Sequence, residues 1–207
     1  MNLFRTRSVP LAALALSVLA LDASAAVIDF DDMATPYYAQ EYSGFSSGGF
    51  DFSASIGYPG EYFVVWGVDN GYNADPGAAT VAADYPNAVV TMAASDGAAF
   101  NLVSIDFADI YNSGTASGLL FTFNHAAGGS STRTLFTDAT RGLQTFVFDQ
   151  VGLSSVSWVS TSGTVLSAQF DNVTTTAAVP VPEPTSAALL AAGLVAVAGG
   201  ARLRRNR

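Results

Sequence analysis

The fold is decided by residues 99–124, where AFNLVSIDF (Ala99–Phe107) is followed, after a polar stretch with two glycines, by LLFTFN (Leu119–Asn124). Large apolar residues occupy every second position of the second segment. The first segment shows the same alternation with one change of phase at Leu102-Val103. A period of two places alternate side chains on opposite faces of a strand, and an inserted residue shifts that phase. Both segments are therefore predicted to be strands, the first with a bulge.

Residues 26–173 continue in this manner, with short apolar runs separated by Gly, Ser, Asn, Asp and Pro and without a sustained helical period. This pattern predicts an all-β fold, an antiparallel β-sandwich. A jelly roll of roughly eight strands is the preferred topology and an immunoglobulin-like sandwich the alternative. Residues 69–87 are predicted to form one long loop at an end of the sandwich. The other expected strands are Val27–Asp31, Phe50–Ser55, Tyr62–Val68, Ala88–Met92, Thr132–Phe136, Gln144–Phe148, Ser155–Val159 and Val165–Val173.

Composition excludes several classes of function. The chain of 207 residues has no cysteine, which removes disulfides, thiolate catalysis and cysteine-based metal centres. Its formal net charge is −9, and between residues 26 and 180 only Arg133 and Arg141 oppose 15 acidic residues. Such a surface repels phosphate backbones, so we expect no nucleic-acid partner. The acidity suits divalent cations, or it serves solubility alone.

Residues 1–25 have the parts of a signal peptide. Arg5 and Arg7 form a positive start, Leu11–Leu21 is apolar, and Ala23-Ser24-Ala25 is an A-x-A cleavage site. The mature chain is therefore expected to begin at Ala26 and to be exported. An uncleaved membrane helix is the alternative, for which the apolar run is short.

The last residues have three parts in a fixed order, preceded by a Thr- and Ala-rich linker over residues 174–180. The motif Pro182-Glu183-Pro184 comes first, and an apolar segment over residues 187–201 follows. A basic tail closes the sequence. Residues of the apolar segment and tail that we assign to the membrane anchor are Ala187, Leu190, Leu194, Val197, Arg202, Arg204, Arg205 and Arg207. The arginines would stay on the cytoplasmic side of the membrane.

This order over residues 181–207 resembles the PEP-CTERM sorting signal. The resemblance implies recognition by an exosortase, transient anchoring in the inner membrane through the apolar helix, and removal of the tail. It also implies a final place at the cell surface or in an extracellular, exopolysaccharide-rich biofilm matrix. A plain tail anchor is the alternative.

The region between the two ends is also similar to the β-sandwich ectodomains of PEP-CTERM proteins and to galactose-binding-like carbohydrate-binding modules. The similar features are IDFDD at residues 28–32, FNLVSIDF at residues 100–107 and FDNV at residues 170–173. This second resemblance implies a jelly roll and a sugar-binding or matrix role.

Carboxylates at the first and last expected strands form a candidate calcium site. Asp29 and Asp31 lie in and at the end of the first strand, and Asp171 lies in the last. In a jelly roll these strands often pair, which would bring the carboxylates together as oxygen ligands for a structural Ca²⁺. The alternative is that they are exposed ends of strands and the Asx turns after them.

The long loop is the candidate sugar site. Tyr72 and Tyr85 provide aromatic faces that stack on the C–H surface of a sugar, and Asp69 and Asp75 could bind its hydroxyls. An ordinary Asn-Gly turn explains the acidic start of the loop better than a calcium-binding loop does. Trp66 and Trp158 stand within apolar runs and are assigned to the core.

Enzymatic catalysis finds little support in the sequence. His125 is the only histidine, and no serine stands in a G-x-S-x-G elbow. We therefore expect a non-enzymatic protein of the cell surface or extracellular matrix, active in adhesion or exopolysaccharide association. A secreted hydrolase acting on polysaccharide is one alternative, and a purely structural matrix protein without a specific ligand is another.

Overall fold

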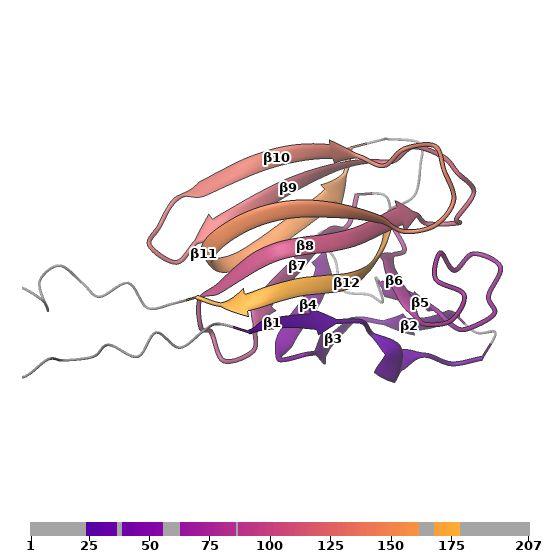
Figure 1. Ribbon diagram of the computed structural model, residues 1–207, viewed down its shortest axis with the longest axis horizontal. Helices are drawn as coiled ribbons and strands as arrows, with labels where there is room; N and C mark the ends of the chain where they lie inside the picture. The colour runs from indigo at the N-terminus through magenta and orange to yellow at the C-terminus, as the bar shows by residue number, and fades with distance from the viewer. Residues whose placement is uncertain (1–23, 37–38, 56–62, 86, 162–167, 179–207) are drawn as a thin grey trace, which may run out of the picture.

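The computed structural model describes residues 24–36, 39–55, 63–85, 87–161 and 168–178 (Figure 1). These residues form one 3-10 helix, η1 (Asp31–Met33), and twelve strands: β1 (Ala25–Ile28), β2 (Ala39–Tyr42), β3 (Gly44–Ser47), β4 (Phe50–Ser55), β5 (Phe63–Trp66), β6 (Thr80–Ala83), β7 (Val89–Ala94), β8 (Phe100–Asp109), β9 (Gly118–His125), β10 (Ser130–Phe136), β11 (Gln144–Ser160) and β12 (Ala168–Ala177). All pairs of these strands are antiparallel. The predicted all-β antiparallel fold is confirmed, and the jelly roll stays a prediction.

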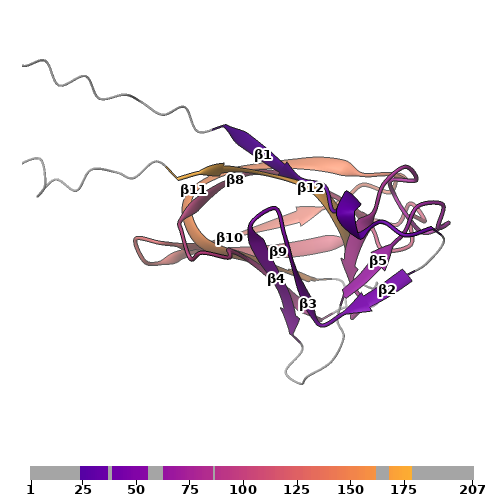
Figure 2. The same ribbon diagram turned by 90° about the horizontal axis from the view of Figure 1, so that it is seen from below.

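The long strand β11 connects two layers. Its first half pairs with β8 up to Leu153, and its second half pairs with β9 on one side and β7 on the other. The strand bends around one side of the molecule between the two halves (Figure 2). One layer therefore contains β1, β12, β8 and the first half of β11. The other contains β10, β9, the second half of β11, β7, β4 and β3.

The sequence predicted two strands, Gln144–Phe148 and Ser155–Val159, where the structure has one. The residues between them change the register against β8 twice instead of forming a turn. Asp149 and Gly152 adopt positive φ angles of 50° and 63° at these two places. Glycine takes this conformation at little cost, so the bulged strand bends without ending.

The bulge predicted at Leu102-Val103 is confirmed. Against β12, the register of β8 moves from Ser104 directly to Leu102, which leaves Val103 as the additional residue. Leu102 and Ile105 are both buried although two residues separate them. Because of the extra residue, the apolar side chains face the core both before and after the register shift.

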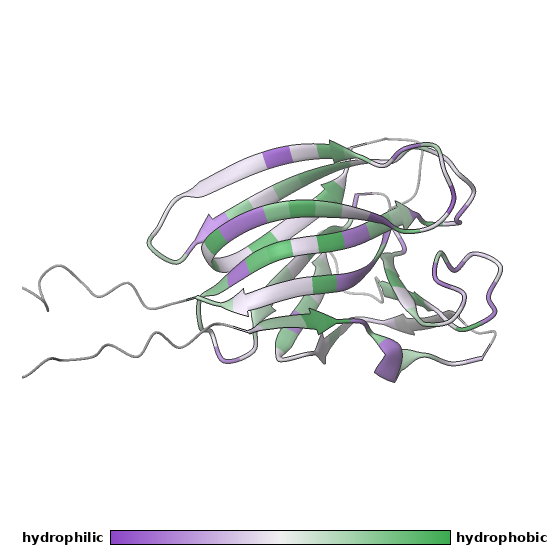
Figure 3. Cartoon of the chain, in the orientation of Figure 1, coloured by the Kyte–Doolittle hydropathy of each residue, from purple (hydrophilic) through white to green (hydrophobic). Residues whose placement is uncertain are grey.

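Aromatic side chains from both layers fill the core. Hydropathy alternates along the strands, as Figure 3 shows for β8 and β11. Phe107 on β8 contacts Phe121 and Trp158 of the other layer, with ring centroids 5.5 and 6.0 Å apart. Phe170 on β12 lies 5.0 Å from Trp158 and 6.0 Å from Phe52. The assignment of Trp158 to the core is confirmed.

The expected loop over residues 69–87 is shorter in the structure, because β6 lies within it. β6 pairs with β5 on one side and with residues 169–170 of β12 on the other, and all four of its side chains are buried. A four-residue Thr-Val-Ala-Ala segment is too short and too small to produce a clear strand pattern. β2 and β3 were missed as well. At the other end, β12 continues through Ala177 into the residues assigned to the linker.

Both sequence appendages fall outside the described residues. The signal peptide, apart from its last two positions, and the whole sorting signal belong to residues 1–23 and 179–207. Within the described residues, no helix has the length and apolar character that crossing a membrane requires.

Replacing Phe107 by alanine should strongly destabilise the fold. The ring is fully buried among aromatic neighbours of both layers, so its loss leaves a cavity costing about 3–5 kcal/mol of unfolding free energy. Phe136, whose side chain is 68% exposed, is the matched control, and Phe136→Ala should change stability by no more than about 0.5 kcal/mol. Urea unfolding followed by tryptophan fluorescence measures both, and equal losses would contradict the assignment of the core.

Candidate functional site: an aromatic platform

Three aromatic side chains gather at one end of the molecule. The ring centroids of Trp66 and Tyr72 are 5.5 Å apart, those of Tyr72 and Tyr111 are 5.1 Å apart, and those of Trp66 and Tyr111 are 6.4 Å apart. Tyr72 is 50% exposed and Tyr111 is 41% exposed, whereas Trp66 is 9% exposed and lies beneath them. We call these three residues the aromatic platform.

The platform is assembled from two loops. Trp66 is the last residue of β5, Tyr72 lies in the loop of residues 67–79 that joins β5 to β6, and Tyr111 follows the end of β8. The end of β8 faces the start of β12, where Asp109 pairs with Ala168. The opposite end holds the pairs Ala25–Thr176 and Phe100–Ala177. The platform therefore lies far from the described chain ends (Figure 1).

Asn73 fixes the shape of the loop that carries Tyr72. Its side-chain amide donates to the carbonyl oxygens of Trp66, Gly67 and Ala78 at 3.2, 3.0 and 2.9 Å. Its side-chain oxygen accepts from the backbone N–H of Asp75 at 2.9 Å. A buried amide that serves both arms of a loop holds them together without secondary structure.

Asp109 does the same for the loop that carries Tyr111. Its buried carboxylate accepts hydrogen bonds of 2.9–3.3 Å from the backbone N–H groups of Tyr111, Ser113, Gly114 and Thr115, and one from the Ser113 hydroxyl. Burial by itself raises the pKa of Asp109, but the donors in residues 113–115 outweigh it and hold the pKa below its usual value. The ionised carboxylate of Asp109 thus holds this loop in shape through hydrogen bonds to its backbone N–H groups.

Gln169 joins the two loops to the sheet. This residue of β12 is fully buried, and its amide donates to the carbonyl oxygens of Tyr72 at 2.9 Å and Asp109 at 2.7 Å. Its side-chain oxygen accepts from the backbone N–H of Ala74 at 2.9 Å and from the Thr80 hydroxyl at 2.6 Å. One carboxamide therefore positions the backbones beside both exposed tyrosines.

Asn112 adds a third loop to this arrangement. Its side chain donates to the carbonyl oxygen of Asn73 at 3.1 Å and accepts from the backbone N–H of Gly142 at 2.7 Å. Its backbone takes a positive φ of 48°, which asparagine tolerates better than most residues. Three separate loops are thus connected by hydrogen bonds under the aromatic rings, so the platform is built before any ligand arrives.

The structure brings together part of the sugar site that the sequence predicted. Asp69, Tyr72 and Asp75 lie in the platform loop. Tyr85 does not belong with them, because it follows β6 at the end where Ala83 pairs with Phe63, whereas Trp66 pairs with Thr80 at the other end. Tyr111 was not among the predicted site residues, and Trp66 was predicted as a core residue without its exposed neighbours. The signal for Tyr111 was the polar turn YNSGTASG at residues 111–118, directly after a strongly predicted strand.

A buried carboxylate lies next to this network. Asp171 is 1% exposed, and burial raises its pKa to about 8, with further contributions from the charges of Asp75, Asp31 and Asp106. Its carboxylate accepts from the backbone N–H of Asn172 at 2.7 Å. An acid with this pKa is protonated at neutral pH unless a cation takes the place of the proton.

The two other candidate calcium ligands differ in their relation to Asp171. The expected pairing of first and last strands is confirmed, since Ile28 of β1 pairs with Val173 of β12. Asp31 is close enough for its charge to act on Asp171. Asp29 is exposed, and its carboxylate accepts from the backbone N–H of Asp31 at 3.3 Å, as in an Asx turn. In the described part of the chain, no three Asp, Glu or His side chains are gathered closely enough to hold a metal ion.

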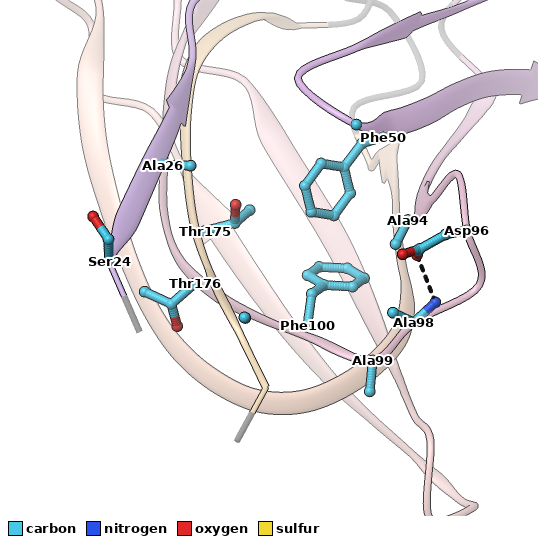
Figure 4. A pocket seen from close by; sticks show the side chains of 12 residues that line it. Ser24, Ala26, Phe50, Ala94, Asp96, Ala98, Ala99, Phe100, Thr175 and Thr176 are labelled. Carbon is cyan, nitrogen blue, oxygen red and sulfur yellow. Dashed lines mark hydrogen bonds between the residues drawn. The ribbon is translucent and has the colours of Figure 1, made fainter. Parts of the chain in front are cut away.

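The single histidine and a hollow at the other end of the molecule show fewer polar contacts than the platform. His125 ends β9, and its Nε2 lies 3.3 Å from the hydroxyl of Ser131 across the β9–β10 hairpin. A hollow of about 340 Å³ lies at the end of the molecule away from the platform, where the rings of Phe50 and Phe100 meet (Figure 4). Small side chains form most of its wall, and the carboxylate of Asp96 accepts from the backbone N–H of Ala98.

Replacing Gln169 by leucine should destabilise the protein and loosen the platform. The change leaves the carbonyls of Tyr72 and Asp109 and the N–H of Ala74 without their partner, at about 1–3 kcal/mol for each buried group that stays unpaired. Gln150→Leu is the control, because the Gln150 amide donates only to the carbonyl of Phe148. Urea unfolding gives the loss of stability. Amide hydrogen exchange at Ala74 should accelerate in Gln169→Leu alone, and unchanged exchange would contradict this role.

No family model matches the chain, and no curated protein matches it. Among solved structures, a DUF4465 family protein from Bacteroides ovatus is similar at 10% identity and a TM-score of 0.45, over 75% of this chain and 99% of that one. A family 29 carbohydrate-binding module is similar at 10% identity and a TM-score of 0.41, over 78% and 98%. A xylan-binding domain from Paenibacillus barcinonensis is similar at 10% identity and a TM-score of 0.37, over 76% and 97%. Likenesses at this level leave the function to be argued from the chain's own residues.

Proposed function

We propose that this is an exported, non-enzymatic carbohydrate-binding protein that holds a polysaccharide chain on its aromatic platform. The single observation that carries the proposal is the exposure of Tyr72 and Tyr111 over Trp66, at the end of the fold where a buried hydrogen-bond network holds their loops. A contiguous exposed apolar patch rimmed by polar residues commonly marks a binding site.

The geometry of the rings favours a flat, partly apolar ligand. The centroids are separated by only 5.1–6.4 Å, so the rings pack on one another and leave no space between them for a small molecule. A ligand must therefore lie across their outward faces. The C–H face of a sugar ring is apolar and slightly electropositive, and it suits the electron-rich face of an aromatic ring. The hydroxyls at the edge of the sugar would then meet Asp75 and the loop backbone.

Two buried carboxylates beneath the platform, those of Asp109 and Asp171, are poorly suited to catalysis. Asp109 already accepts five hydrogen bonds, and its lowered pKa makes it a weak general acid. Asp171 has a raised pKa, which suits a general acid, but it is buried where a glycosidic bond cannot reach it. A secreted hydrolase acting on polysaccharide remains the rival function, and loss of polymer on incubation with the protein would identify it.

We propose in addition that the protein reaches the cell surface or the extracellular matrix through the signal peptide and the exosortase-recognised sorting signal of residues 181–207. The polarity of the fold supports this proposal. β1 begins and β12 ends side by side, since Ala25 pairs with Thr176, and the platform lies at the opposite end. A chain attached through its C-terminal side at the cell surface would present the platform outward, toward an extracellular polysaccharide.

Replacing Tyr72 and Tyr111 by alanine should abolish most of the polysaccharide binding. Truncation of a well-packed aromatic contact at a binding site typically costs about 1–3 kcal/mol, which corresponds to a roughly 5- to 150-fold weaker affinity for each ring. Tyr85→Ala is the matched control, because Tyr85 is similarly exposed, at 38%, but lies at the other end of the β5–β6 pair. Titration of the purified protein with a panel of soluble polysaccharides, followed by calorimetry, measures these affinities.

Two results would contradict the proposal. Equal loss of binding in Tyr85→Ala and in the platform variants would place the site elsewhere. Failure of the unchanged protein to bind any polysaccharide would favour a purely structural matrix protein without a specific ligand.

We propose Ca²⁺ as the physiological counterion of Asp171. The buried carboxylate faces three other acidic residues and needs either a proton or a cation to be neutral. Oxygen ligands are the ones that Ca²⁺ prefers. The candidates to complete its shell together with Asp171 are the three residues whose charges act on it, Asp31, Asp75 and Asp106. Their side chains must close on Asp171 for this, since they are not gathered into a metal site in the structure.

Stability without calcium should fall as pH rises from about 4 to 8. Within this window the folded state keeps the proton on Asp171, whose pKa is about 8, while the unfolded state, with a value near 3.8, has released it. Calcium should therefore raise the melting temperature most at the alkaline end. Asp171→Asn should remove both the pH dependence and the calcium effect, whereas Asp149→Asn, at an exposed position, should keep them. If the melting temperature at pH 8 is the same with calcium and with EDTA, the protein does not bind calcium at Asp171.

A further inference from the structure

We propose that the platform selects its polysaccharide by charge: it prefers chains that carry protonated amino groups, binds neutral chains less tightly, and rejects chains that carry uronate or sulfate groups. This inference rests on the proposed function and names the class of ligand for the same site. It follows from the charged groups that surround the three aromatic rings.

Two acidic residues belong to the loop that carries Tyr72. Asp69 is exposed, and it lies in the turn that the backbone N–H of Asn70 closes on the carbonyl of Gly67 at 3.2 Å. Asp75 is half-buried, and its carboxylate has a long contact of 3.5 Å with the backbone N–H of Gly77. Both residues stand within three positions of Tyr72 in the sequence, so the loop that presents this ring carries two negative charges.

Positive charge is scarce at this end of the described chain. Arg133 is on β10, where its guanidinium donates to the carbonyl of Val147 at 2.8 Å and covers the ring of Phe148. Arg141 is the one basic residue in the loops around the platform, next to Gly142. Asp138 lies in the same loop and adds an opposite charge. The local balance is therefore negative even with Arg141 included.

Aromatic rings and carboxylates favour the same kind of group. The face of a tyrosine or tryptophan ring attracts a cation electrostatically, and an adjacent carboxylate adds a charge-assisted hydrogen bond. An ammonium group on a sugar can use both while the sugar ring itself stacks. A uronate or sulfate group on the same ring is repelled by both. A neutral hydroxyl or acetamido group gains the stacking but neither electrostatic contribution.

The test compares glycans of one length that differ in charge. The purified protein is titrated at mildly acid pH with tetramers of β-1,4-linked glucosamine, N-acetylglucosamine and glucose, and with a tetramer of galacturonate. We expect the glucosamine tetramer to bind about tenfold more tightly than the two neutral ones, and the galacturonate tetramer not to bind detectably. The advantage of the amine should shrink as salt is raised, because the charges are at the surface.

Variants separate local recognition from the general acidity of the protein. The double variant Asp69→Asn with Asp75→Asn should lose the preference for the amine, so that the glucosamine tetramer binds no more tightly than the neutral ones. The control pair Asp96→Asn with Asp149→Asn removes the same charge away from the platform and should keep the preference. Binding of the glucosamine tetramer should also be lost in the variant Tyr72→Ala with Tyr111→Ala.

Three outcomes would overturn this inference while the proposed function stands. They are tighter binding of galacturonate that Arg141→Ala abolishes, an unchanged amine preference in the Asp69 and Asp75 double variant, and equal affinity for charged and neutral tetramers that still requires Tyr72 and Tyr111. Glucosamine binding that survives without the two tyrosines would also overturn it, because attraction would then be spread over the surface. Failure of every tetramer to bind would instead count against carbohydrate binding itself.

Discussion

The side-chain amide of Gln169 is the contact on which the platform end of this protein depends. Two loops that are far apart in the sequence, one after β5 and one after β8, lie beside each other because one buried carboxamide on β12 is hydrogen-bonded to Tyr72, Ala74 and Asp109. Asn73 and Asp109 then hold each loop in its own shape. Beneath the exposed rings lies a group of hydrogen-bonded polar side chains, Asn73, Asp109 and Gln169, which fixes the positions of the two loops.

A loop that becomes ordered only when a ligand binds loses conformational entropy at that step, which weakens the affinity. A loop that is already ordered in the folded protein does not lose this entropy on binding. The loops of the platform are ordered in the folded protein. The neighbouring Asp171 works in the opposite direction, because a buried carboxylate surrounded by Asp31, Asp75 and Asp106 weakens the fold whenever it is ionised. The stability of this end of the molecule is thereby linked to the protonation of Asp171.

The fold was more predictable from the sequence than the site. Alternation of large apolar side chains is a local signal, and it correctly placed β4, β8 and β9, including the bulge at Val103. Strand β6 was not predicted because its four residues are small and become a strand only between β5 and β12. Part of the platform was not predicted for a similar reason. The loops of the platform are joined by Gln169, which is 97 residues from Tyr72 in the sequence. No local sequence pattern indicates that a glutamine forms hydrogen bonds to such distant loops. Tyr85 shared a stretch of sequence with Tyr72, and β6 separates the two in space.

The antiparallel course of β12 has a mechanical consequence. The strand runs from Gln169, under the platform, to Ala177, beside the start of β1, and it is hydrogen-bonded to β8 over almost its whole length. Hydrogen bonds between antiparallel strands lie perpendicular to the strand axis. If the platform holds a polysaccharide and the chain is attached at its other end, as proposed, a pull between the two acts along the strand and loads these bonds together in shear. These hydrogen bonds must break together instead of one after another, so a larger force is needed to separate β12 from β8.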